Sequence, residues 1–546
     1  MYLGDLFTRD GVARSLLERT KAVNNSFCTS CRTLVPSRRV EREGKVYLVK
    51  DCPKCGPTES IISSSAERHS HKRDLDPGWD YEGCNAKCLE CGHHRTPRYA
   101  FIDVTNRCNL NCPMCADSVQ NHEFAFDPPM SFFKRVFEHL ATLKPQPTLA
   151  FFGGEPTVRE DLVDIIKLAR SYGFNVRVLT NGLRLADEEY CRELVKARPH
   201  LLVSYDGANP ETYQQLRHSA KVLEVKKKAI ENLSKTPRAK VSFVTLFGWG
   251  LNHKELPDLL EFYHQHRDML QGVYLMPLVH TWDAAQFDYT PERRMTTECV
   301  EKLLNDVYPD YKVEFISLGL ASHYVTLMKY LGREPMPYYG AHPNCESFYL
   351  LVDKGESYLP VDHYLRGSFT ELAAGLLKLE KKLVAREERW QTSLVGRALG
   401  AVRLRNFALR TLGLSQLGLT LLRRVRWGRL IKGWGPAKLY HAPMALLERL
   451  LGRDSEKVRK SHLAVDGLLR IVILPLEDNP IVETERLERC PSTHVYFDPR
   501  DETIHYVPVC SWRLVNKQVL GDLSAFYQKE KAASEPQPAE AAVGKA

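Results

Sequence analysis

Between residues 98 and 325, short apolar runs alternate with longer stretches in which apolar residues recur every three or four positions. The short runs are rich in β-branched and aromatic residues, which is typical of buried strands. We expect six of these strands: Tyr99–Val104, Thr148–Phe152, Asn175–Leu179, Leu201–Tyr205, Val241–Leu246 and Val273–Met276. The longer stretches, such as Asp161–Tyr172 and Glu211–Leu233, are predicted to form helices. Strands that alternate with helices in this way predict parallel βαβ units and an α/β fold.

Shorter patterns lie on both sides of this unit. The run Lys45–Val49 predicts a small β-ribbon, and Glu371–Glu388 predicts a charged helix. Leu469–Leu474 predicts a further strand, and Val495–Phe497 with Ile504–Val507 predicts a hairpin. We therefore divide the chain into an N-terminal domain at 1–80, a loop at 81–97, the α/β unit at 98–325, a helical region at 326–460, a C-terminal region with a little β structure at 461–531, and a disordered tail at 532–546.

The composition indicates a globular chain and limits its partners. Of the 546 residues, 43% are hydrophobic and 26% are charged, which is too apolar for a disordered chain. The formal net charge of +9 is too small to indicate a nucleic-acid partner, and we expect none. The apolar stretch Thr411–Leu422 is too short to span a bilayer. Met1–Arg14 shows no secretory pattern, so we expect a cytoplasmic protein.

The chain has 15 cysteines, and ten of them lie in its first 115 residues in three groups. Without an export signal, this number indicates metal or redox chemistry rather than a disulfide framework. The first group pairs Cys28-x2-Cys31 with Cys52-x2-Cys55, and Gly56 follows the second pair. Two such knuckles predict a tetrahedral site of four thiolates. Zinc is the expected ion, although a single rubredoxin-like iron uses the same ligands.

The loop after the first predicted strand carries the most informative cysteines. Cys108, Cys112 and Cys115 have the spacing C-x3-C-x2-C, so that one loop supplies three thiolates. A 4Fe–4S cluster held by three cysteines keeps one iron open for a substrate or cofactor. This loop resembles the signature of the radical S-adenosylmethionine (SAM) superfamily. The resemblance implies SAM at the open iron, a 5′-deoxyadenosyl radical, and a partial (β/α)6 barrel over residues 98–325.

Later segments extend the resemblance in the order that the superfamily shows. Each follows a predicted strand, and active sites of barrels lie at the carboxyl ends of their strands. Gly153-Gly154-Glu155 resembles the segment that meets the SAM amino group, and Met114 takes the place of an aromatic residue against the adenine. The resemblance implies these SAM-binding residues: Met114, Gly153, Gly154, Glu155, Asn181, Ser204 and Asp206.

The middle group, Cys84, Cys88 and Cys91, repeats the same spacing directly before the α/β unit. No Gly-Gly-Glu follows it at the right distance, so we expect an auxiliary 4Fe–4S cluster. Its fourth ligand is expected from one of three loop cysteines near prolines, which makes one complete auxiliary cluster and leaves too few thiols for a second. The candidates for that ligand are Cys345, Cys490 and Cys510, with the nearby His93 and His94 as alternatives; Cys191 and Cys299, in predicted helices, are expected to be small buried side chains.

From Arg397 to Lys438 the chain has ten Lys or Arg residues and no Asp or Glu. Apolar residues recur there at helical spacing, flanked by arginines: Leu414, Leu417, Leu421 and Val425, followed by Trp427, Leu430, Ile431 and Trp434. This pattern predicts either a helix that lies in a membrane interface or an ordinary helical subdomain with a solvated basic side.

The order of the cysteine groups resembles that of the tetraether lipid synthase family. The resemblance implies that the chain joins the unactivated tail carbons of two lipids. It also implies a low-potential electron donor such as ferredoxin or flavodoxin, and peripheral contact with the inner membrane surface through residues 397–438. Two alternatives stay open: a radical SAM enzyme that modifies or methylates a soluble small molecule or peptide, and a non-enzymatic iron–sulfur or zinc interaction protein.

Overall fold

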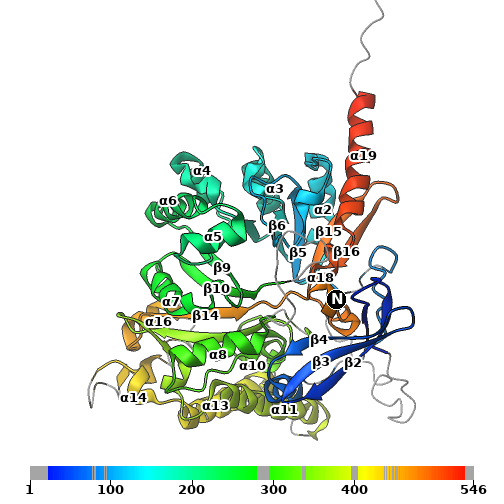
Figure 1. Ribbon diagram of the computed structural model, residues 1–546. Helices are drawn as coiled ribbons and strands as arrows, with labels where there is room; N and C mark the ends of the chain where they lie inside the picture. Colours follow the sequence, from blue (N-terminus) through cyan, green and yellow to red (C-terminus); the bar gives the residue numbers. More distant parts are fainter. Residues whose placement is uncertain are drawn as a thin grey trace, which may run out of the picture.

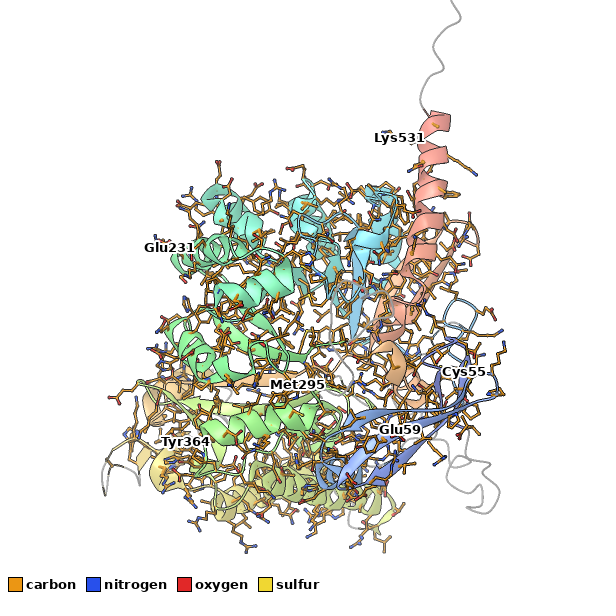
Figure 2. All side chains as sticks on the ribbon, in the orientation of Figure 1. Cys55, Glu59, Glu231, Met295, Tyr364 and Lys531 are labelled. Atoms are coloured by element: carbon orange, nitrogen blue, oxygen red, sulfur yellow. The ribbon has the colours of Figure 1, made fainter. Side chains whose placement is uncertain are left out.

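The computed structural model describes residues 23–279, 294–394 and 404–534, apart from gaps at 77, 79–80, 92, 94, 335–337 and 339 and short gaps between 434 and 454. His94, Trp434 and most of the predicted tail therefore lie outside the described residues. Figure 1 shows an N-terminal β domain in blue beside the α/β unit, with a layer of helices in yellow along one end. The C-terminal helix α19 (Asn516–Ser534), which carries Lys531 in Figure 2, extends away from the body.

A parallel sheet organises the α/β unit. Six strands lie side by side in chain order: β5 (Tyr99–Thr105), β6 (Thr148–Gly153), β7 (Val176–Thr180), β8 (His200–Ser204), β9 (Val241–Phe247) and β10 (Leu270–Pro277). Each matches one of the predicted runs. Helices connect them: α2 (Met130–Thr142), α3 (Leu162–Ser171), α4 (Glu188–Lys196), α5 (Pro210–Arg217), α6 (Val222–Lys235), α7 (Leu256–Gln265) and, after β10, α8 (Thr297–Val307). The α/β fold with a curved parallel sheet is confirmed.

Alternation along the strands separates the two faces of the sheet. On β6, Leu149 and Phe151 are fully buried, and Phe151 stacks on Phe137 of α2 at 6.2 Å between ring centroids. Phe152, the next residue, is only half-buried and meets Phe101 of β5 at 5.8 Å. Side chains such as Phe151 therefore pack under the helices, and those such as Phe152 line the inner face of the sheet.

The predicted helix Glu211–Leu233 is wrong in one respect, because it is two helices. Helix α5 ends at Arg217, and α6 begins at Val222. Between them, His218 adopts a left-handed conformation with φ of 58°, which stops the first helix. A non-glycine residue rarely takes this conformation, so the sequence gives no sign of the break.

The C-terminal residues are not a separate layer. Strand β14 (Gly467–Ile473) pairs in parallel with β10, and β15 (Ser492–Asp498) pairs in parallel with β5. The predicted hairpin is confirmed, since β15 pairs antiparallel with β16 (Thr503–Pro508). Beyond β14 the sheet continues with antiparallel strands β12 (Ser347–Asp353), β11 (Ile316–Ser317) and β13 (Tyr358–Pro360). Late parts of the chain thus extend both edges of the sheet.

The N-terminal domain is a small antiparallel sheet with the order β1-β2-β3-β4. Its strands are β1 (Asn25–Phe27), β2 (Leu34–Arg42), β3 (Lys45–Cys52) and β4 (Gly56–Ser63), and helix α1 (Ala66–Asp74) follows them. Half-buried and buried ion pairs attach it to the rest of the chain. Arg39 meets Glu483 at 2.7 Å, and Lys72 of α1 meets Glu301 of α8 at 2.9 Å. The predicted β-ribbon is confirmed.

The helical layer consists of α11 (Phe369–Thr392) and α13 (Arg405–Arg424), with the short helices α9 (Leu318–Ala321), α10 (Val325–Tyr330), α14 (Trp427–Leu430) and α16 (Ser455–His462). Of the two interpretations of residues 397–438, the packing of this predicted apolar face favours the helical subdomain. Leu414, Leu417 and Leu421 lie against the main hydrophobic core, and Gly413 faces the ring of Tyr330. Within the described residues, none of the helices is long and apolar enough to cross a bilayer.

Candidate active site and cysteine groups

The loop that carries Cys108, Cys112 and Cys115 begins where β5 ends. Asn106 holds the base of the loop, because its side-chain amide donates to Phe124 O at 2.9 Å and accepts from Phe126 N at 2.7 Å. Cys108 is exposed, and Cys112 and Cys115 are half-buried. Burial raises the pKa of Cys115 to about 12, and the nearby Asp117 adds to this shift. Ligation of a metal would therefore release protons from this loop.

Gly153 and Gly154 touch the cysteine loop itself. A Cβ atom on Gly154 would lie 2.1 Å from the carbonyl oxygen of Arg107, and one on Gly153 would lie 2.2 Å from that of Thr105. The Gly154 and Glu155 amides donate to the same two carbonyls, to Thr105 O and Arg107 O, at 2.8 Å each. The glycines are needed because the end of β6 runs against the start of the cysteine loop.

Glu155 braces the ends of two neighbouring strands. It is almost fully buried, and its carboxylate accepts from Thr180 Oγ1 at 2.6 Å and from Asn181 N at 2.6 Å. The side-chain amide of Asn181 in turn donates to Asn109 Oδ1, within the cysteine loop, at 2.7 Å. Glu155 and Asn181 therefore fix the position of the loop against β7.

Lys226 is a central residue that the sequence patterns missed. Its amine is buried and donates to Ser204 Oγ at 2.8 Å, to Ser204 O at 2.6 Å and to Asn181 O at 2.6 Å. Burial lowers its pKa to about 7, and Arg217 lowers it further. Lys226 thus ties together two predicted SAM-binding residues from neighbouring strands.

The side chain of Asp206 faces the guanidinium of Arg217. Its carboxylate is fully buried and pairs with Arg217 at 2.7 Å. The Arg217 guanidinium also lies 3.5 Å from the thiol of Cys112. Asp206 therefore positions Arg217 beside the cysteine loop. Helical residues such as Arg217 and Lys226 carry no recognisable spacing, which is why the sequence did not point to them.

Met114 lies in a small apolar cluster beside these polar groups. It is 5% exposed and packs with Leu216 and Leu278. The cluster adjoins the inner face of the sheet, where apolar side chains are half-buried. These side chains are Phe101, Phe152, Leu179, Val244, Leu246 and Met276. This part of the inner face is therefore apolar, and the strand ends above it carry charged groups.

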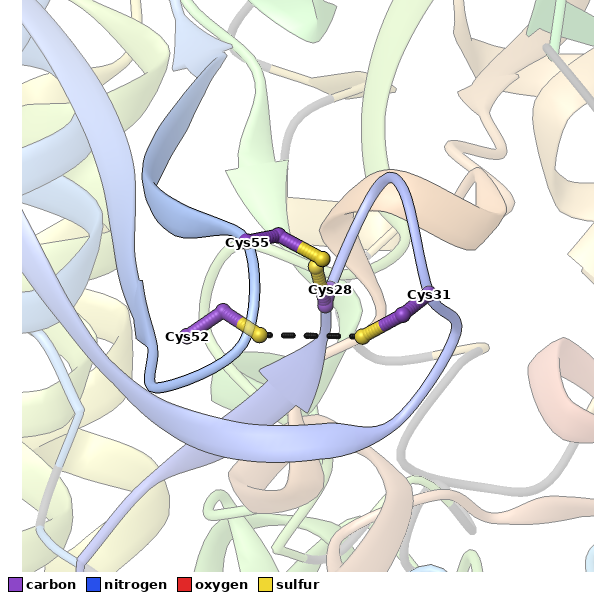
Figure 3. Close-up of side chains that lie close together, drawn as sticks. All are labelled: Cys28, Cys31, Cys52 and Cys55. Carbon is purple, nitrogen blue, oxygen red and sulfur yellow. Dashed lines mark hydrogen bonds between the residues drawn. The ribbon is translucent and has the colours of Figure 1, made fainter.

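The first cysteine group forms a compact site in the N-terminal domain (Figure 3). The four sulfur atoms of Cys28, Cys31, Cys52 and Cys55 all lie within 4.8 Å of one another. The Cys31 and Cys52 sulfurs are 3.6 Å apart, and a hydrogen bond with Thr33 lowers the pKa of Cys31 to about 6. This convergence, with a thiolate already favoured, fits one tetrahedral ion.

The middle group, Cys84, Cys88 and Cys91, meets the C-terminal part of the chain. Burial raises the pKa of Cys88 to about 12 against the lowering effect of a hydrogen bond with Ser511, and the thiols of Cys84 and Cys91 contribute to the rise. The Cys88 sulfur lies 3.2 Å from Ser511 Oγ, in helix α18 (Val509–Trp512). His93 Nε2 donates to the carbonyl oxygen of Cys490 at 3.1 Å.

The three late cysteines influence the pKa values of one another's thiols. Burial raises the pKa of Cys490 well above its ordinary range, and the thiols of Cys510 and Cys345 raise it further. Arg489, in the loop after α17 (Thr484–Glu488), ties two of the segments together by donating to Gly340 O at 2.8 Å. That one of these cysteines completes the middle group stays a prediction. Two contacts bring the groups together: Ser511, next to Cys510, has its hydroxyl 3.2 Å from the Cys88 sulfur, and His93 contacts the carbonyl of Cys490.

Cys191 and Cys299 lie in helices, as expected. Cys191 of α4 is fully buried, and Cys299 of α8 is half-buried with its sulfur 3.4 Å from Ser64 Oγ. Their sulfur atoms contact Thr236 Oγ1 and Ser64 Oγ, respectively, which belong to none of the cysteine groups described above.

Comparisons with known proteins agree with this geometry. The profile of the radical SAM superfamily matches residues 102–263, and that of the HMPTM N-terminal zinc ribbon domain matches residues 22–64. A 7,8-dihydro-6-hydroxymethylpterin dimethyltransferase of Methanocaldococcus jannaschii is 30% identical over 363 residues, which cover 62% of this chain and 70% of the relative. The chain belongs to the radical SAM superfamily. A GTP 3′,8-cyclase of Peptoclostridium acidaminophilum is 29% identical over 35% of this chain and 60% of its own length.

Among solved structures, Streptococcus suis SuiB bound to S-adenosylmethionine is similar at 14% identity and a TM-score of 0.31, over 39% of this chain and 48% of SuiB. As a radical SAM enzyme, the chain uses SAM and a 4Fe–4S cluster. The cysteine loop fits that cluster, because it offers three thiols, one of them exposed, on a loop fixed by Asn106 and Asn181. A cluster of four irons is wider than one ion, so its thiols need not converge as those of the zinc ribbon do.

Proposed function

We propose that this radical SAM enzyme removes a hydrogen atom from an unactivated C–H bond of a lipid tail, in the cytoplasm at the membrane surface, and joins two tail carbons. The observation that carries the proposal is the apolar inner face directly below the charged strand ends. Leu179, Val244, Leu246 and Met276 are half-buried there and offer apolar side chains to a substrate. A lipid tail has no polar group to satisfy, so it binds where the walls are equally apolar.

The residues at the strand ends then have separate tasks. Cys108, Cys112 and Cys115 hold the cluster, and Glu155 and Asn181 keep their loop in place. Lys226 orients Ser204, and Arg217, whose guanidinium lies 3.5 Å from the thiol of Cys112, offers a cationic side chain for the SAM carboxylate. When bound and reduced, SAM supplies a 5′-deoxyadenosyl radical that is strong enough to remove an aliphatic hydrogen. Met114, Leu216 and Leu278 exclude water from that end of the site.

The remaining cysteines provide for two auxiliary 4Fe–4S clusters under this proposal. Cys84, Cys88 and Cys91 hold one, and Cys345, Cys490 and Cys510 hold the other. Three thiols in each group keep a position open for a further ligand. A coupling reaction needs electrons at defined steps, so we assign these clusters to electron transfer or to substrate binding. A ferredoxin or flavodoxin is the expected donor.

The proposal is tested by an anaerobic reaction with reconstituted enzyme, SAM, dithionite and membrane lipids, followed by mass spectrometry. Phe152→Arg places a charge on the inner face and should abolish lipid products while the fold is retained. Phe101→Leu, a neighbouring change that stays apolar, should keep them. Lipid products that survive Phe152→Arg would contradict binding on this face.

A second candidate, methylation of a pterin-like heterocycle, is favoured by the relative from Methanocaldococcus jannaschii. A polar patch deeper on the inner face supports it. The Arg177 guanidinium lies over the Tyr99 ring at 4.4 Å and donates to Tyr274 OH at 3.3 Å. The hydroxyl of Tyr99 is 2.8 Å from that of Tyr338. These groups can hydrogen-bond to the edge of a flat heterocycle.

Arg177→Leu separates the two candidates. Under the pterin proposal it should prevent methyl transfer to 6-hydroxymethyl-7,8-dihydropterin, because the heterocycle loses its charged partner. Under the lipid proposal it should leave lipid coupling unchanged or faster. The mass shift of the pterin and that of the lipids are read from the same samples.

A further inference from the structure

An open apolar groove lies at the far end of the barrel from the SAM site. It has a volume of 1310 Å³ and is bounded by α13 and α14 on one side and by the first residues of β10 and β14 on the other. Its apolar lining includes Leu421, Leu422, Trp427, Leu430, Leu468 and Leu469. The SAM site lies at the carboxyl ends of the same strands, so the groove takes no part in the chemistry described above.

The outer ridge of α13 continues from this groove and is also apolar. Leu422, which lines the groove, is 56% exposed, and Leu419 and Phe407 farther along the helix are 53% and 69% exposed. On the groove's other wall, Leu468 is 62% exposed. Leu419 and Leu422 are three residues apart, so they point to the same side of the helix. A cluster of large apolar side chains in solvent marks an interaction surface.

The basic charge lies on the helices and not in the groove. Residues 405–433 contain seven Lys or Arg and no Asp or Glu, and Arg423, Arg426, Arg429 and Lys432 are exposed. The groove itself is lined by charges of both signs: Asp268, Asp353, Glu456 and Asp466 with Arg267, Arg459 and Lys460. Two ion pairs form among these side chains, Asp353 with Arg267 at 3.3 Å and Glu456 with Lys460 at 2.8 Å. An anionic partner with an apolar portion complements the ridge of α13.

We propose that the ridge of α13 docks on the anionic phospholipid bilayer and that one phospholipid inserts an acyl chain into the groove. Apolar residues on a ridge flanked by arginines are the features of a helix that lies in a membrane interface. The groove extends the apolar contact below the ridge, where an acyl chain fits. The phosphate groups of the lipids then meet Arg423, Arg426 and Lys432. This face of α13 is opposite to the one that the sequence suggested.

The test uses the reconstituted holoenzyme and vesicles of phosphatidylglycerol and phosphatidylcholine, without SAM or reductant. The enzyme should sediment with the anionic vesicles and not with pure phosphatidylcholine, and added salt should weaken binding. Leu422→Glu should weaken it about tenfold, because it replaces an apolar contact with the bilayer by a charge. Val225→Glu, a matched change on the exposed face of α6, should have no effect. Equal binding of the two variants would overturn the docking surface.

The fluorescence of Trp427 reports on the groove itself. Phosphatidylglycerol with brominated acyl chains should quench the wild-type enzyme more than Trp427→Phe, because Trp427 lines the groove. Equal quenching of both proteins would overturn the acyl-chain site. Release of 5′-deoxyadenosine should be unchanged in Leu422→Glu, which shows that the fold is intact.

The docking surface rests on the proposed function in one respect: an enzyme that acts on lipid tails must take its substrate from a membrane. The two fail in different assays. Vesicle binding without lipid products would leave the docking surface in place and overturn lipid coupling. Lipid products from an enzyme that does not bind vesicles would overturn the docking surface alone.

Discussion

The thiol of Cys88 lies 3.2 Å from the hydroxyl of Ser511, and the residue before Ser511 is Cys510. One short helix, α18, therefore touches both auxiliary cysteine groups. It also reaches the SAM-cluster strand, because the indole of Trp512 donates to Asp103 Oδ2 of β5 at 3.0 Å. The C-terminal segment thus connects all three sites that we assign to 4Fe–4S clusters. It provides a short path of covalent bonds and hydrogen bonds between them.

Cys108→Ala should abolish SAM cleavage, because the cluster loses one of its three thiolates. The measurement is 5′-deoxyadenosine release after anaerobic reconstitution, together with iron content. Cys191→Ala is the matched control, since Cys191 is buried in a helix and holds no cluster. Full release from Cys108→Ala would contradict the assignment of the loop.

Cys88→Ala and Cys345→Ala should each spare release of 5′-deoxyadenosine and block the final product. Each should also lower the iron content by one cluster, since the two residues belong to different groups. Iron content and electron paramagnetic resonance of the reduced proteins provide the check. If the two variants lose the same cluster, there is a single auxiliary site.

Gly154→Ala should displace the cysteine loop, because the new Cβ would lie 2.1 Å from Arg107 O. We expect a loss of about 1–3 kcal/mol in the free energy of unfolding, with weaker cluster binding. Gly375→Ala in α11 has nothing within 4 Å and should stabilise by about 0.5–1 kcal/mol. Urea unfolding of both variants, with iron content, makes the comparison. An unaltered Gly154→Ala protein would refute the close approach.

Lys226 should make stability rise with pH above neutrality. Burial lowers its pKa to about 7 in the folded chain, whereas an unfolded lysine titrates near 10.4, so the unfolded state binds more protons between these values. Unfolding free energies at pH 7 and pH 9 should therefore differ less in Lys226→Met than in the wild type. Lys227→Met, which removes an exposed neighbour, serves as the control and should keep the wild-type difference.

Removal of the zinc-ribbon metal should open the N-terminal domain and leave SAM cleavage in place. Its four thiols lie together in a sheet that is separate from the parallel sheet. Cys31→Ser should lose one metal ion per chain and become sensitive to proteolysis within residues 23–64. Metal analysis also identifies the ion as zinc or iron. Loss of SAM cleavage in this variant would show that the domain supports the active site.

The sequence predicted what depends on local spacing. The six strands of the barrel, the knuckles and the C-x3-C-x2-C loop are all local patterns of apolar residues or thiols. Contacts between distant segments were not readable. The buried pairs of Arg217 with Asp206 and of Lys226 with Ser204 join separate elements, and neither cation stands out from its neighbours.

The same limit applies to the late cysteines and to helix α13. The surroundings of Cys490 depend on Arg489, which donates to Gly340 O, and on strand β15, which pairs with β5. Helix α13 has apolar residues on two faces, so periodicity alone did not show whether the face of Leu417 or the face of Leu422 is exposed to solvent. Packing against α10 and α11 covers the face of Leu417.

The most direct test of the central claim is mass spectrometry of an anaerobic reaction that contains reconstituted enzyme, SAM, reductant and membrane lipids. The account predicts 5′-deoxyadenosine together with a lipid product at the summed mass of two lipids less the hydrogens lost, both absent from Cys108→Ala. Release of 5′-deoxyadenosine with every lipid unchanged would contradict lipid coupling.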